Sequence, residues 1–362
     1  MKKVVIGISG GVDSSIAAWM LKKIGYQVEA VFMQNWEEDQ NCDSKKDFLI
    51  SQMVCKKLGI PIEKINFSYE YWEKVFKKFI LDYKSGYTPN PDILCNKEIK
   101  FKVFLNFAIE QLNANYIATG HYVRKLVIQN RTFLIKGKDQ KKDQSYFLYS
   151  LNEKQISKCL FPIGHLKKKI VRKIAKNLRL INAKKKSSTG ICFIGEKKFQ
   201  NFIKKYIPKN PGKIVSSTGE ELGLHNGLHL YTIGQRKGIR IGGKKGFQNF
   251  PWYVVKKDIK KNFLFVSQGK NNLDLFSKII KIKNFHMINK NFFRLPIKCK
   301  AKIRYQQKEE KCILKKNKNT KSVYAVFKNP VYAATIGQSI VFYVKNCCIG
   351  GGIIQNNFKK LV

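Results

Sequence analysis

The chain of 362 residues is long for one domain, so its length predicts two or three domains. Its hydrophobic fraction of 44% is enough to build sizeable cores. No apolar run reaches the roughly 18 residues that a membrane-spanning helix needs, which argues against an integral membrane protein. Met1, Lys2 and Lys3 lead directly into a strand-like segment rather than a signal sequence. We therefore expect a cytoplasmic protein that works without a membrane.

The formal net charge of +46 has two explanations. Lysine and arginine neutralise phosphates and release counterions, so a strongly basic protein is suited to a nucleic-acid partner. The alternative is compositional bias, because lysine, asparagine and isoleucine are all abundant, as they are in proteins encoded by AT-rich genomes. The charge is spread along the chain rather than confined to a tail. Charge alone therefore leaves both explanations open.

Strand-like and helix-like segments alternate through about the first 120 residues. The first helix-like segment carries Ile16, Met20 and Ile24 on one face and ends at Gly25. Such alternation is typical of α/β proteins with a doubly wound parallel sheet. The expected strands are residues 3–8, 28–33, 61–67 and 116–119, and the expected helices are residues 13–24, 43–58, 70–83 and 97–112.

The pattern changes after about residue 205, where glycines and short apolar runs dominate. Short runs divided by turn residues are typical of all-β structure that closes as a sandwich or a barrel. Residues 206–212, which contain two prolines, an asparagine and a glycine, form the expected boundary. The expected strands are residues 213–215, 228–231, 252–255, 263–266, 297–305, 311–314, 323–327, 339–343 and 350–354.

The stretch GISGGVDSS, residues 7–15, joins the first expected strand to the first expected helix. Backbone N–H groups and the helix dipole suit such a turn to a phosphate, and glycines let the backbone approach it. Asp13 can cap the helix or orient a metal ion that accompanies a nucleotide. The loop is neither a Walker A sequence nor GxGxxG. Residues 9–14 match the SGGxDS pyrophosphate loop of the N-type ATP pyrophosphatases, so we predict an ATP site rather than a simple capped turn.

Nine cysteines occur, and none forms a CxxC pair, which argues against a zinc ribbon or a thioredoxin motif. Cys95 lies near an expected helix start, where the dipole lowers the pKa of a thiol, and Asp92 is within reach as an acid or base. Cys192 is flanked by serine, threonine and glycine, as expected of a loop. Two accessible cysteines can carry sulfur, one as a persulfide and one to resolve it. Packing roles are expected for Cys42, Cys55, Cys159, Cys299 and Cys312.

These motifs belong to a longer series of matches. In chain order they are SGGVDSS (9–15), FMQNWEED (32–39), NPDILCNKEIKF (90–101), YIATGHYVR (116–124), KDQSYFLY (142–149), STGICFIG (188–195), GQRKG (234–238), PWYVV (251–255) and CIGGGII (348–354). With them the chain resembles the bacterial tRNA-specific 2-thiouridylases over essentially its whole length.

The resemblance implies ATP-dependent 2-thiolation of the wobble uridine, U34, in tRNAs for Lys, Glu and Gln. It implies that ATP adenylates the C2 oxygen and that AMP and pyrophosphate are released. In this pattern Cys192 carries a persulfide, Cys95 is the nucleophile that forms a transient disulfide with Cys192, and Asp92 is the acid or base. The sulfide that is freed attacks C2, unless the persulfide attacks directly. A cysteine desulfurase or a relay protein would supply the sulfur.

The resemblance also implies three domains and three sets of binding residues. The domains are an adenine nucleotide hydrolase-like catalytic domain (1–205), a central β-rich domain (206–272) and a C-terminal β-barrel that contacts tRNA (273–362). ATP would bind with Mg²⁺, and no metal would be ligated by the protein. The ATP set is Gly7, Ile8, Ser9, Gly10, Gly11, Val12, Asp13, Ser14, Met33 and Gly120. The target-base set is Asn90, Pro91 and Asp92, and the tRNA set is His121, Lys142, Asp143, Gln144, Arg304, Tyr305 and Gln338.

The chain departs from the family pattern at three positions. Ser187 stands where an aspartate is frequent, Gln306 where an arginine is common, and Ile336 where a proline is usual. Two other functions stay open: a ligase of the same fold that adenylates a small carbonyl substrate and needs neither cysteine, and an RNA-binding protein with a decayed ATP site. The intact loop argues against decay.

Two further expectations concern structure rather than chemistry. We expect the lysine runs 167–169 and 184–186 to be solvated. The aromatic residues Phe101, Phe104 and Phe107 recur at helical spacing, which favours a place in the core over a base-stacking platform.

Overall fold

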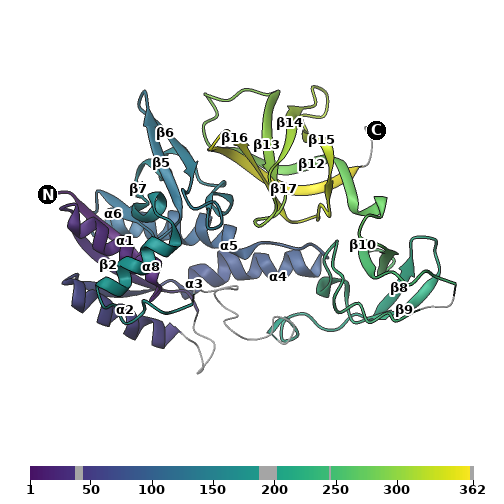
Figure 1. Cartoon of the computed structure of the whole chain (residues 1–362), viewed down its shortest axis with the longest axis horizontal. Helices are drawn as coiled ribbons and strands as arrows, with labels where there is room; N and C mark the ends of the chain where they lie inside the picture. Colours follow the sequence, from purple (N-terminus) through teal and green to yellow (C-terminus); the bar gives the residue numbers. More distant parts are fainter. Residues whose placement is uncertain (37–43, 187–201, 244–245, 359–362) are drawn as a thin grey trace.

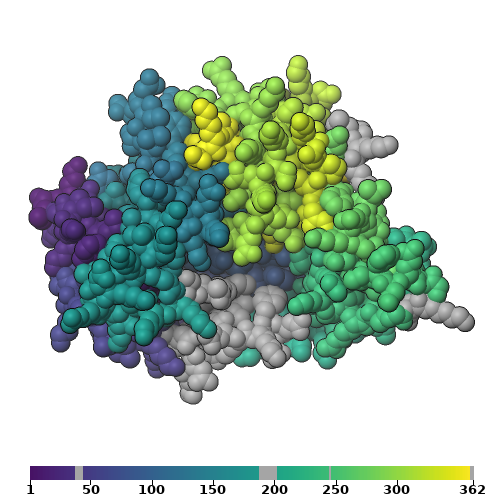
Figure 2. Space-filling model, viewed as in Figure 1, coloured from purple at the N-terminus to yellow at the C-terminus, as the bar shows by residue number. Residues whose placement is uncertain are grey.

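The computed structural model describes residues 1–36, 44–186, 202–243 and 246–358. It consists of an N-terminal α/β part, a central β-sheet and a C-terminal barrel (Figure 1). In the space-filling view these parts form one continuous body, with the barrel above the central sheet and the N-terminal part beside both (Figure 2). The predicted fold class is therefore confirmed. Within the described ranges, no helix is long and apolar enough to cross a membrane.

The N-terminal sheet is parallel throughout, in the strand order β3-β2-β1-β4-β7. Its first strand is buried along almost all of its length because helices cover both faces of the sheet. The strands are β1 (Lys3–Ile8), β2 (Gln27–Gln34), β3 (Ile62–Asn66), β4 (Tyr116–Ala118) and β7 (Cys159–Leu160). The helices α1 (Val12–Lys23), α2 (Ser44–Leu58), α7 (Glu153–Ser157) and α8 (Lys168–Asn177) belong to the same part.

Two longer helices contain π-helical turns. One consists of α3 (Ser68–Tyr71), a π-helical segment (Trp72–Phe76) and α4 (Lys77–Lys84), which extends toward the central sheet (Figure 1). The other consists of α5 (Pro91–Leu94), a π-helical segment (Cys95–Val103) and α6 (Phe104–Glu110). The second begins six residues before the predicted helix 97–112, because the Asn90 side chain accepts the Asp92 N–H at 3.1 Å and caps it. Phe101 and Phe104 are fully buried and Phe107 packs at the edge, as expected.

The barrel is one antiparallel sheet that closes on itself through pairing of its first and last strands, β12 and β17. Its strands are β12 (Phe276–Met287), β13 (Ile297–Lys302), β14 (Glu310–Lys316), β15 (Val323–Tyr332), β16 (Ser339–Val344) and β17 (Cys347–Phe358). A hairpin from the N-terminal part, β5 (Val123–Ile128) and β6 (Arg131–Lys136), extends this sheet. Cys347 and Cys348 pair with Ile135 and Leu134 of β6. The sequence did not predict this hairpin, which joins the two parts.

The central sheet has the strand order β10-β11-β8-β9. Its strands are β8 (Gly212–Ser216), β9 (Glu221–His225), β10 (Trp252–Asp258) and β11 (Phe263–Gln268). The predicted strand at 228–231 is wrong, because Leu228–Leu230 forms a 3₁₀ turn. One such turn brings residues three apart to the same side, and it buries both Leu228 and Tyr231.

Candidate active site

The loop of residues 7–15 runs from the end of β1 to the start of α1, as predicted. Gly10 has φ +67°, in the left-handed region, and a Cβ there would lie 2.7 Å from the carbonyl oxygen of Asp47. The hydroxyls of Ser14 and Ser15 each donate to the carbonyl oxygen of Gly11 at 3.0 Å. The loop is therefore tightly folded, and its shape requires a glycine at position 10.

Two residues of the predicted ATP set lie against this loop from neighbouring strands. A Cβ on Gly7 would lie 2.9 Å from the Cε of Met33, at the end of β2. A Cβ on Gly120, just after β4, would lie 2.6 Å from the backbone nitrogen of Ser14. The three segments meet at the carboxyl ends of parallel strands, where α/β folds bind their ligands.

The carboxylate of Asp13 is the centre of a polar cluster beside the loop. It accepts hydrogen bonds from the Tyr122 hydroxyl at 2.6 Å and from Lys168 Nζ at 2.6 and 2.7 Å. Burial lowers the pKa of Lys168, although Asp13 opposes that effect. Burial, and then the Asp13 charge, raise the pKa of Tyr122, so its hydroxyl remains a donor. The prediction of a solvated lysine run is wrong at Lys168, whose side chain is 11% exposed.

The turn that follows α8 also contacts the loop and stabilises it. The side-chain amide of Asn182 donates to the carbonyl oxygen of Gly10 at 3.0 Å and to the Ser15 hydroxyl oxygen at 2.9 Å. Lys185 forms an ion pair with Asp47, the residue that packs over Gly10. The sequence analysis missed Lys168 and Asn182 because neither lies in a recognisable motif. It also gave Tyr122 no role, although Tyr122 directly follows His121 in one of the matching segments.

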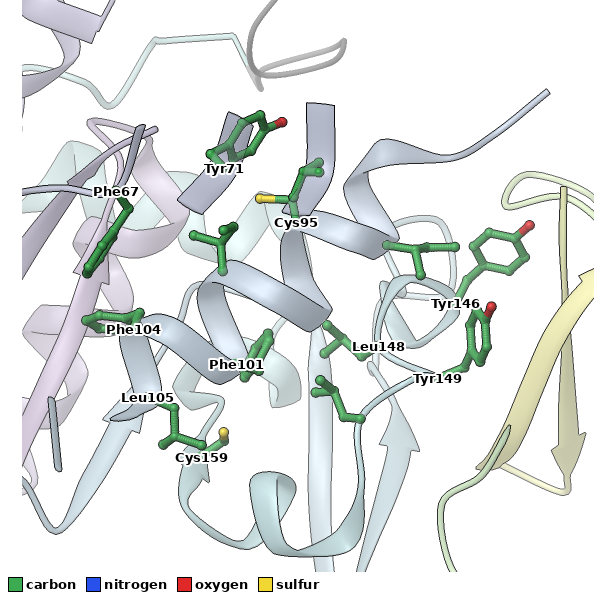
Figure 3. Packing of buried hydrophobic residues seen from close by; sticks show 14 of the residues in the cluster. Phe67, Tyr71, Cys95, Phe101, Phe104, Leu105, Tyr146, Leu148, Tyr149 and Cys159 are labelled. Atoms are coloured by element: carbon green, nitrogen blue, oxygen red, sulfur yellow. The ribbon is translucent and has the colours of Figure 1, made fainter. Parts of the chain in front are cut away.

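The segment from Asn90 to Cys95 forms the first turns of its helix. Burial raises the pKa of the Asp92 carboxyl, and the positive charge of Lys100 offsets part of this effect. Cys95 is only 3% exposed, although an accessible thiol was expected from the sequence. Figure 3 shows Cys95 within the buried cluster beside Tyr71, on the helix that continues to Phe101. Its predicted partner Cys192 lies outside the described residues.

His121 is buried next to Phe101 of the same helix. Its Nδ1 is 2.8 Å from the hydroxyl oxygen of Thr119, and its ring centroid is 5.7 Å from that of Phe101. Burial, and then the charge of Lys100, hold the pKa of His121 well below its usual value. The imidazole is therefore neutral at pH 7.

The segment 142–144 divides into an exposed residue and two that stabilise the fold. Lys142 is exposed. The buried carboxylate of Asp143 accepts from the Gly137 N–H at 2.9 Å and from the Ser145 hydroxyl at 2.8 Å. The Gln144 side-chain oxygen accepts from the backbone N–H of Tyr122 at 2.9 Å. Asp143 and Gln144 thus fix the turn beside the Asp13 cluster.

The predicted tRNA residues of the barrel lie at its contacts with the other two parts. One terminal nitrogen of Arg304 donates to the carbonyl oxygens of Ile233 at 2.7 Å and Ala333 at 2.9 Å. The ring centroid of Tyr305 is 4.4 Å from that of Phe147, and burial raises the pKa of Tyr305 to about 12. Gln338, discussed below, contacts the segment before Asn90.

Three family models match successive parts of the chain. They are described as a tRNA methyl transferase HUP domain (residues 2–196), a tRNA methyl transferase PRC-barrel domain (200–268) and an aminomethyltransferase beta-barrel domain (277–354). A solved 4-thiouridine synthetase–RNA complex with bound ATP is 15% identical with a TM-score of 0.35, and it covers 57% of this chain and 50% of that one. That likeness is too low to add to the assignment.

Curated relatives named tRNA-specific 2-thiouridylase MnmA match almost the whole chain. The protein from Buchnera aphidicola subsp. Acyrthosiphon pisum is 54% identical over 363 residues, covering 99% of this chain and 98% of the relative. The protein from Blochmanniella floridana is 53% identical with the same coverage. That from Escherichia coli O1:K1 is 51% identical, covering 98% of this chain and 97% of the relative. With identity above one half along nearly the full length of each relative, this chain belongs to the family of tRNA-specific 2-thiouridylases.

Proposed function

We propose that this chain is a sulfurtransferase that uses ATP to replace the C2 oxygen of the wobble uridine, U34, with sulfur in tRNAs for Lys, Glu and Gln. The observation that carries the proposal is the 54% identity, over 99% of this chain, to a protein named tRNA-specific 2-thiouridylase. The net charge of +46 gives such a protein a physical reason to bind RNA. We expect it to act in the cytoplasm.

The first step is adenylation of the uridine. In this proposal residues Gly7–Ser14 bind the phosphates of Mg-ATP at the N-terminus of α1, and Met33 and Gly120 contact the nucleotide. The C2 oxygen attacks the α-phosphorus, the bond to the β-phosphate oxygen breaks, and pyrophosphate leaves. The product carries AMP on the C2 oxygen, which turns that oxygen into a leaving group. Packing of Met33 and Gly120 against the loop supports their assignment.

The second step delivers sulfur. Cys192 receives a persulfide from a cysteine desulfurase or a relay protein. The Cys95 thiolate attacks the Cys192 sulfur, which breaks the S–S bond of the persulfide, forms the Cys95–Cys192 disulfide and frees sulfide. Sulfide attacks C2 and AMP leaves with the original oxygen; in the other order, the persulfide attacks C2 before Cys95 resolves it. An external thiol then reduces the disulfide.

Asp92 is proposed as the acid or base of this step. Its raised pKa brings the carboxyl closer to the working pH, where proton transfer is most effective. Asn90 and Pro91 would face the target base, which must leave the stacked anticodon loop to be reached.

We propose a division of labour among residues 1–205, 206–272 and 273–362. The first range would carry both chemical steps, and the barrel would hold tRNA together with parts of the first range. The proposed contacts are His121, Lys142, Asp143, Gln144, Arg304, Tyr305 and Gln338. Arg304, Tyr305 and Gln338 also contact other parts of the chain, which gives them a structural role beside the proposed one.

The test is a thiolation assay on unmodified tRNA with Mg-ATP and a persulfide-loaded donor, read as 2-thiouridine by nucleoside mass spectrometry. Wild type is compared with Cys95→Ser and Cys192→Ser, and Cys347→Ser serves as a matched control because that cysteine is half-buried on the barrel. We expect product from wild type and the control and none from the two other variants. Free sulfide should restore product in Cys192→Ser if Cys192 is only a carrier.

Other products would favour other functions. AMP formed with a small carbonyl acceptor, and unaffected by either substitution, would support the ligase. RNA binding without ATP cleavage would support a decayed enzyme.

A further inference from the structure

Two cysteines of the barrel face each other across neighbouring strands. Cys299 of β13 and Cys312 of β14 are directly opposite in the register of this antiparallel pair. Their sulfur atoms lie 3.6 Å apart, and both side chains belong to the buried core of the barrel. Residues directly opposite in such a pair have Cα atoms about 4.5 to 5.5 Å apart, within the range of about 4.4 to 6.8 Å that a disulfide spans. A bond between the two sulfur atoms therefore needs side-chain rotation and no change of register.

The two thiols differ in how firmly they hold their protons. The hydrogen bond with Cys299, and then burial, raise the pKa of Cys312, so Cys312 is the thiol of the pair that keeps its proton. Cys299 is also the more exposed of the two, at 9% against 5%. An exposure this small admits a small molecule rather than a second protein. Cys299 is therefore placed to react first with a small oxidant, and Cys312 lies beside it to resolve the product.

The two cysteines lie near the base of a loop that joins the barrel to both other parts. The loop, residues 303–309, connects the end of β13 to the start of β14. In this loop Arg304 donates to the carbonyl oxygen of Ile233 in the central part at 2.7 Å. Glu309 forms an ion pair at 2.5 Å with Lys136 of the hairpin from the N-terminal part. A bond between the two cysteines would close the loop at its barrel end.

We propose that Cys299 and Cys312 are a site of reversible oxidation by hydroperoxides, which convert the pair into a disulfide and thereby fix the loop of residues 303–309 near its base. The inference is independent of the proposed sulfur transfer, which uses Cys95 and Cys192. It gives the barrel cysteines a chemical role beyond packing.

The proposed oxidation proceeds in two steps. The Cys299 thiolate attacks one oxygen of hydrogen peroxide, the O–O bond breaks, and a sulfenic acid forms on Cys299. The departing hydroxide takes up the proton that Cys299 had lost and leaves as water. The Cys312 thiol then attacks the Cys299 sulfur, the S–OH bond breaks, and a second water leaves with the Cys312 proton. Two thiols are thus oxidised to a disulfide as one peroxide is reduced to two waters, and an external thiol reverses the change by exchange.

The test is treatment of the full chain with hydrogen peroxide, followed by alkylation of the remaining thiols and peptide mass spectrometry without reductant. Wild type should give a linked pair of peptides that contain Cys299 and Cys312, and dithiothreitol should separate them. In Cys312→Ala a cyclic diketone should trap the sulfenic acid on Cys299. Cys347→Ser, which changes another barrel cysteine, should form the same linked pair as wild type. If peroxide joins other cysteines while Cys299 and Cys312 remain alkylated, the proposal is overturned.

The effect on the loop has its own measurement. Residues 303–309 contain Arg304 and Lys308, so trypsin can cut the loop in the native protein when it opens. Oxidised wild type should be cut there at least about threefold more slowly than reduced wild type, because the closed base limits opening. Cys312→Ala should be cut at the same rate with and without peroxide. A linked pair whose loop is cut as fast as in the reduced protein would show that the bond does not fix the loop. The two wild-type samples decide both points, so a poorly folded variant does not obscure the result.

Discussion

The side-chain amide of Gln338, on the barrel, donates to the carbonyl oxygen of Thr88 at 3.3 Å, two residues before Asn90. The Thr88 N–H in turn donates to the carbonyl oxygen of Ile336 at 3.3 Å. Because Asn90 caps the helix that carries Cys95, the barrel is fixed directly to the start of that helix. This bond uses the main-chain oxygen of Ile336, so it does not depend on the side chain at that position.

A first prediction concerns the glycine between those two barrel residues. Gly337 has φ +90°, and a Cβ there would lie 2.6 Å from the Cβ of Tyr87 and 2.9 Å from the nitrogen of Thr88. Gly337→Ala therefore forces the barrel away from the segment in addition to straining its own backbone. We expect a loss of about 2–4 kcal/mol in the free energy of unfolding, measured in urea, and a slower thiolation reaction.

The matched control is Gly219→Ala. Gly219 has a similar φ of +98°, but a Cβ there would meet nothing within 4 Å. This substitution should show the backbone strain alone, about 1 kcal/mol, with thiolation unchanged. Equal losses in the two variants would show that the contact with Tyr87 and Thr88 contributes nothing.

A second prediction concerns Arg304, which has a structural role whatever its role in RNA binding. One of its terminal nitrogens donates to Ile233 in the central part, and to Ala333 and to the Thr335 hydroxyl oxygen (2.8 Å) on the barrel. Arg304→Met removes the donor that links the Ile233 carbonyl oxygen to the barrel, although the Thr335 hydroxyl still donates to the Ala333 carbonyl oxygen at 3.1 Å. We therefore expect a loss of about 2–4 kcal/mol in the free energy of unfolding and faster proteolysis between the central sheet and the barrel. Urea unfolding and limited proteolysis of the RNA-free protein measure both effects.

Lys142→Met is the companion variant, because Lys142 is exposed and also belongs to the proposed tRNA set. It should leave unfolding unchanged, weaken tRNA binding and reduce the dependence of that binding on salt. If Arg304→Met behaved in the same way, with normal stability, its bonds to the central part and the barrel would be unimportant.

The sequence predicted the parallel sheet, the barrel and the strand-to-helix loop of residues 7–15 because each depends on local patterns. Hydrophobic runs that alternate with helices specify the sheet, and glycines followed by a helix start specify the loop. The family resemblance assigned Gly120 to the ATP set, but its packing against Ser14 was not predicted, because the two residues are distant in sequence.

Long-range contacts explain what the sequence did not predict. Lys168 looked solvated because it stands in a run of lysines, and only the fold brings it to Asp13. The hairpin Val123–Ile128 and Arg131–Lys136 pairs with a strand more than two hundred residues later. Cys95 was expected to be accessible from its place near a helix start, but it belongs to a buried cluster rich in aromatic side chains.

A third prediction uses the pKa of Asp92. Burial raises this pKa and the charge of Lys100 holds it down, so Lys100→Met should raise it further. We expect the limb of the thiolation pH–rate profile that reports Asp92 to move to higher pH. Lys100→Arg, which keeps the charge, should restore the wild-type profile, and Asp92→Asn should abolish the limb. An unmoved profile in Lys100→Met would show that Asp92 does not control the rate.

The same shift has a consequence for stability. An acid whose pKa is higher in the folded state than in the unfolded chain stabilises the fold in its neutral form. The contribution of Asp92 is therefore present at low pH and is lost as the pH rises through its folded pKa. Replacement by asparagine, which is always neutral, should remove this dependence from the unfolding free energy.

The fourth prediction concerns Lys257 of β10, which joins the central sheet to the end of α4. Its Nζ donates to the carbonyl oxygen of Gly86 at 3.1 Å, and burial lowers its pKa to about 8. A base with a lowered folded pKa binds fewer protons in the folded state than in the unfolded chain. Stability should therefore rise as the pH increases from about 8 toward the usual value of 10.5, as burial of the charge ceases to cost free energy.

Thermal unfolding of wild type and Lys257→Met across this range isolates the effect from the titration of other lysines. Methionine keeps the aliphatic length of lysine but has no titrating group. The stability of wild type relative to Lys257→Met should therefore increase as the pH rises. Lys260→Met, an exposed lysine just beyond the same strand, should run parallel to wild type at every pH. If the stability of Lys257→Met also ran parallel to that of wild type at every pH, the Lys257 ammonium would not be desolvated in the folded protein.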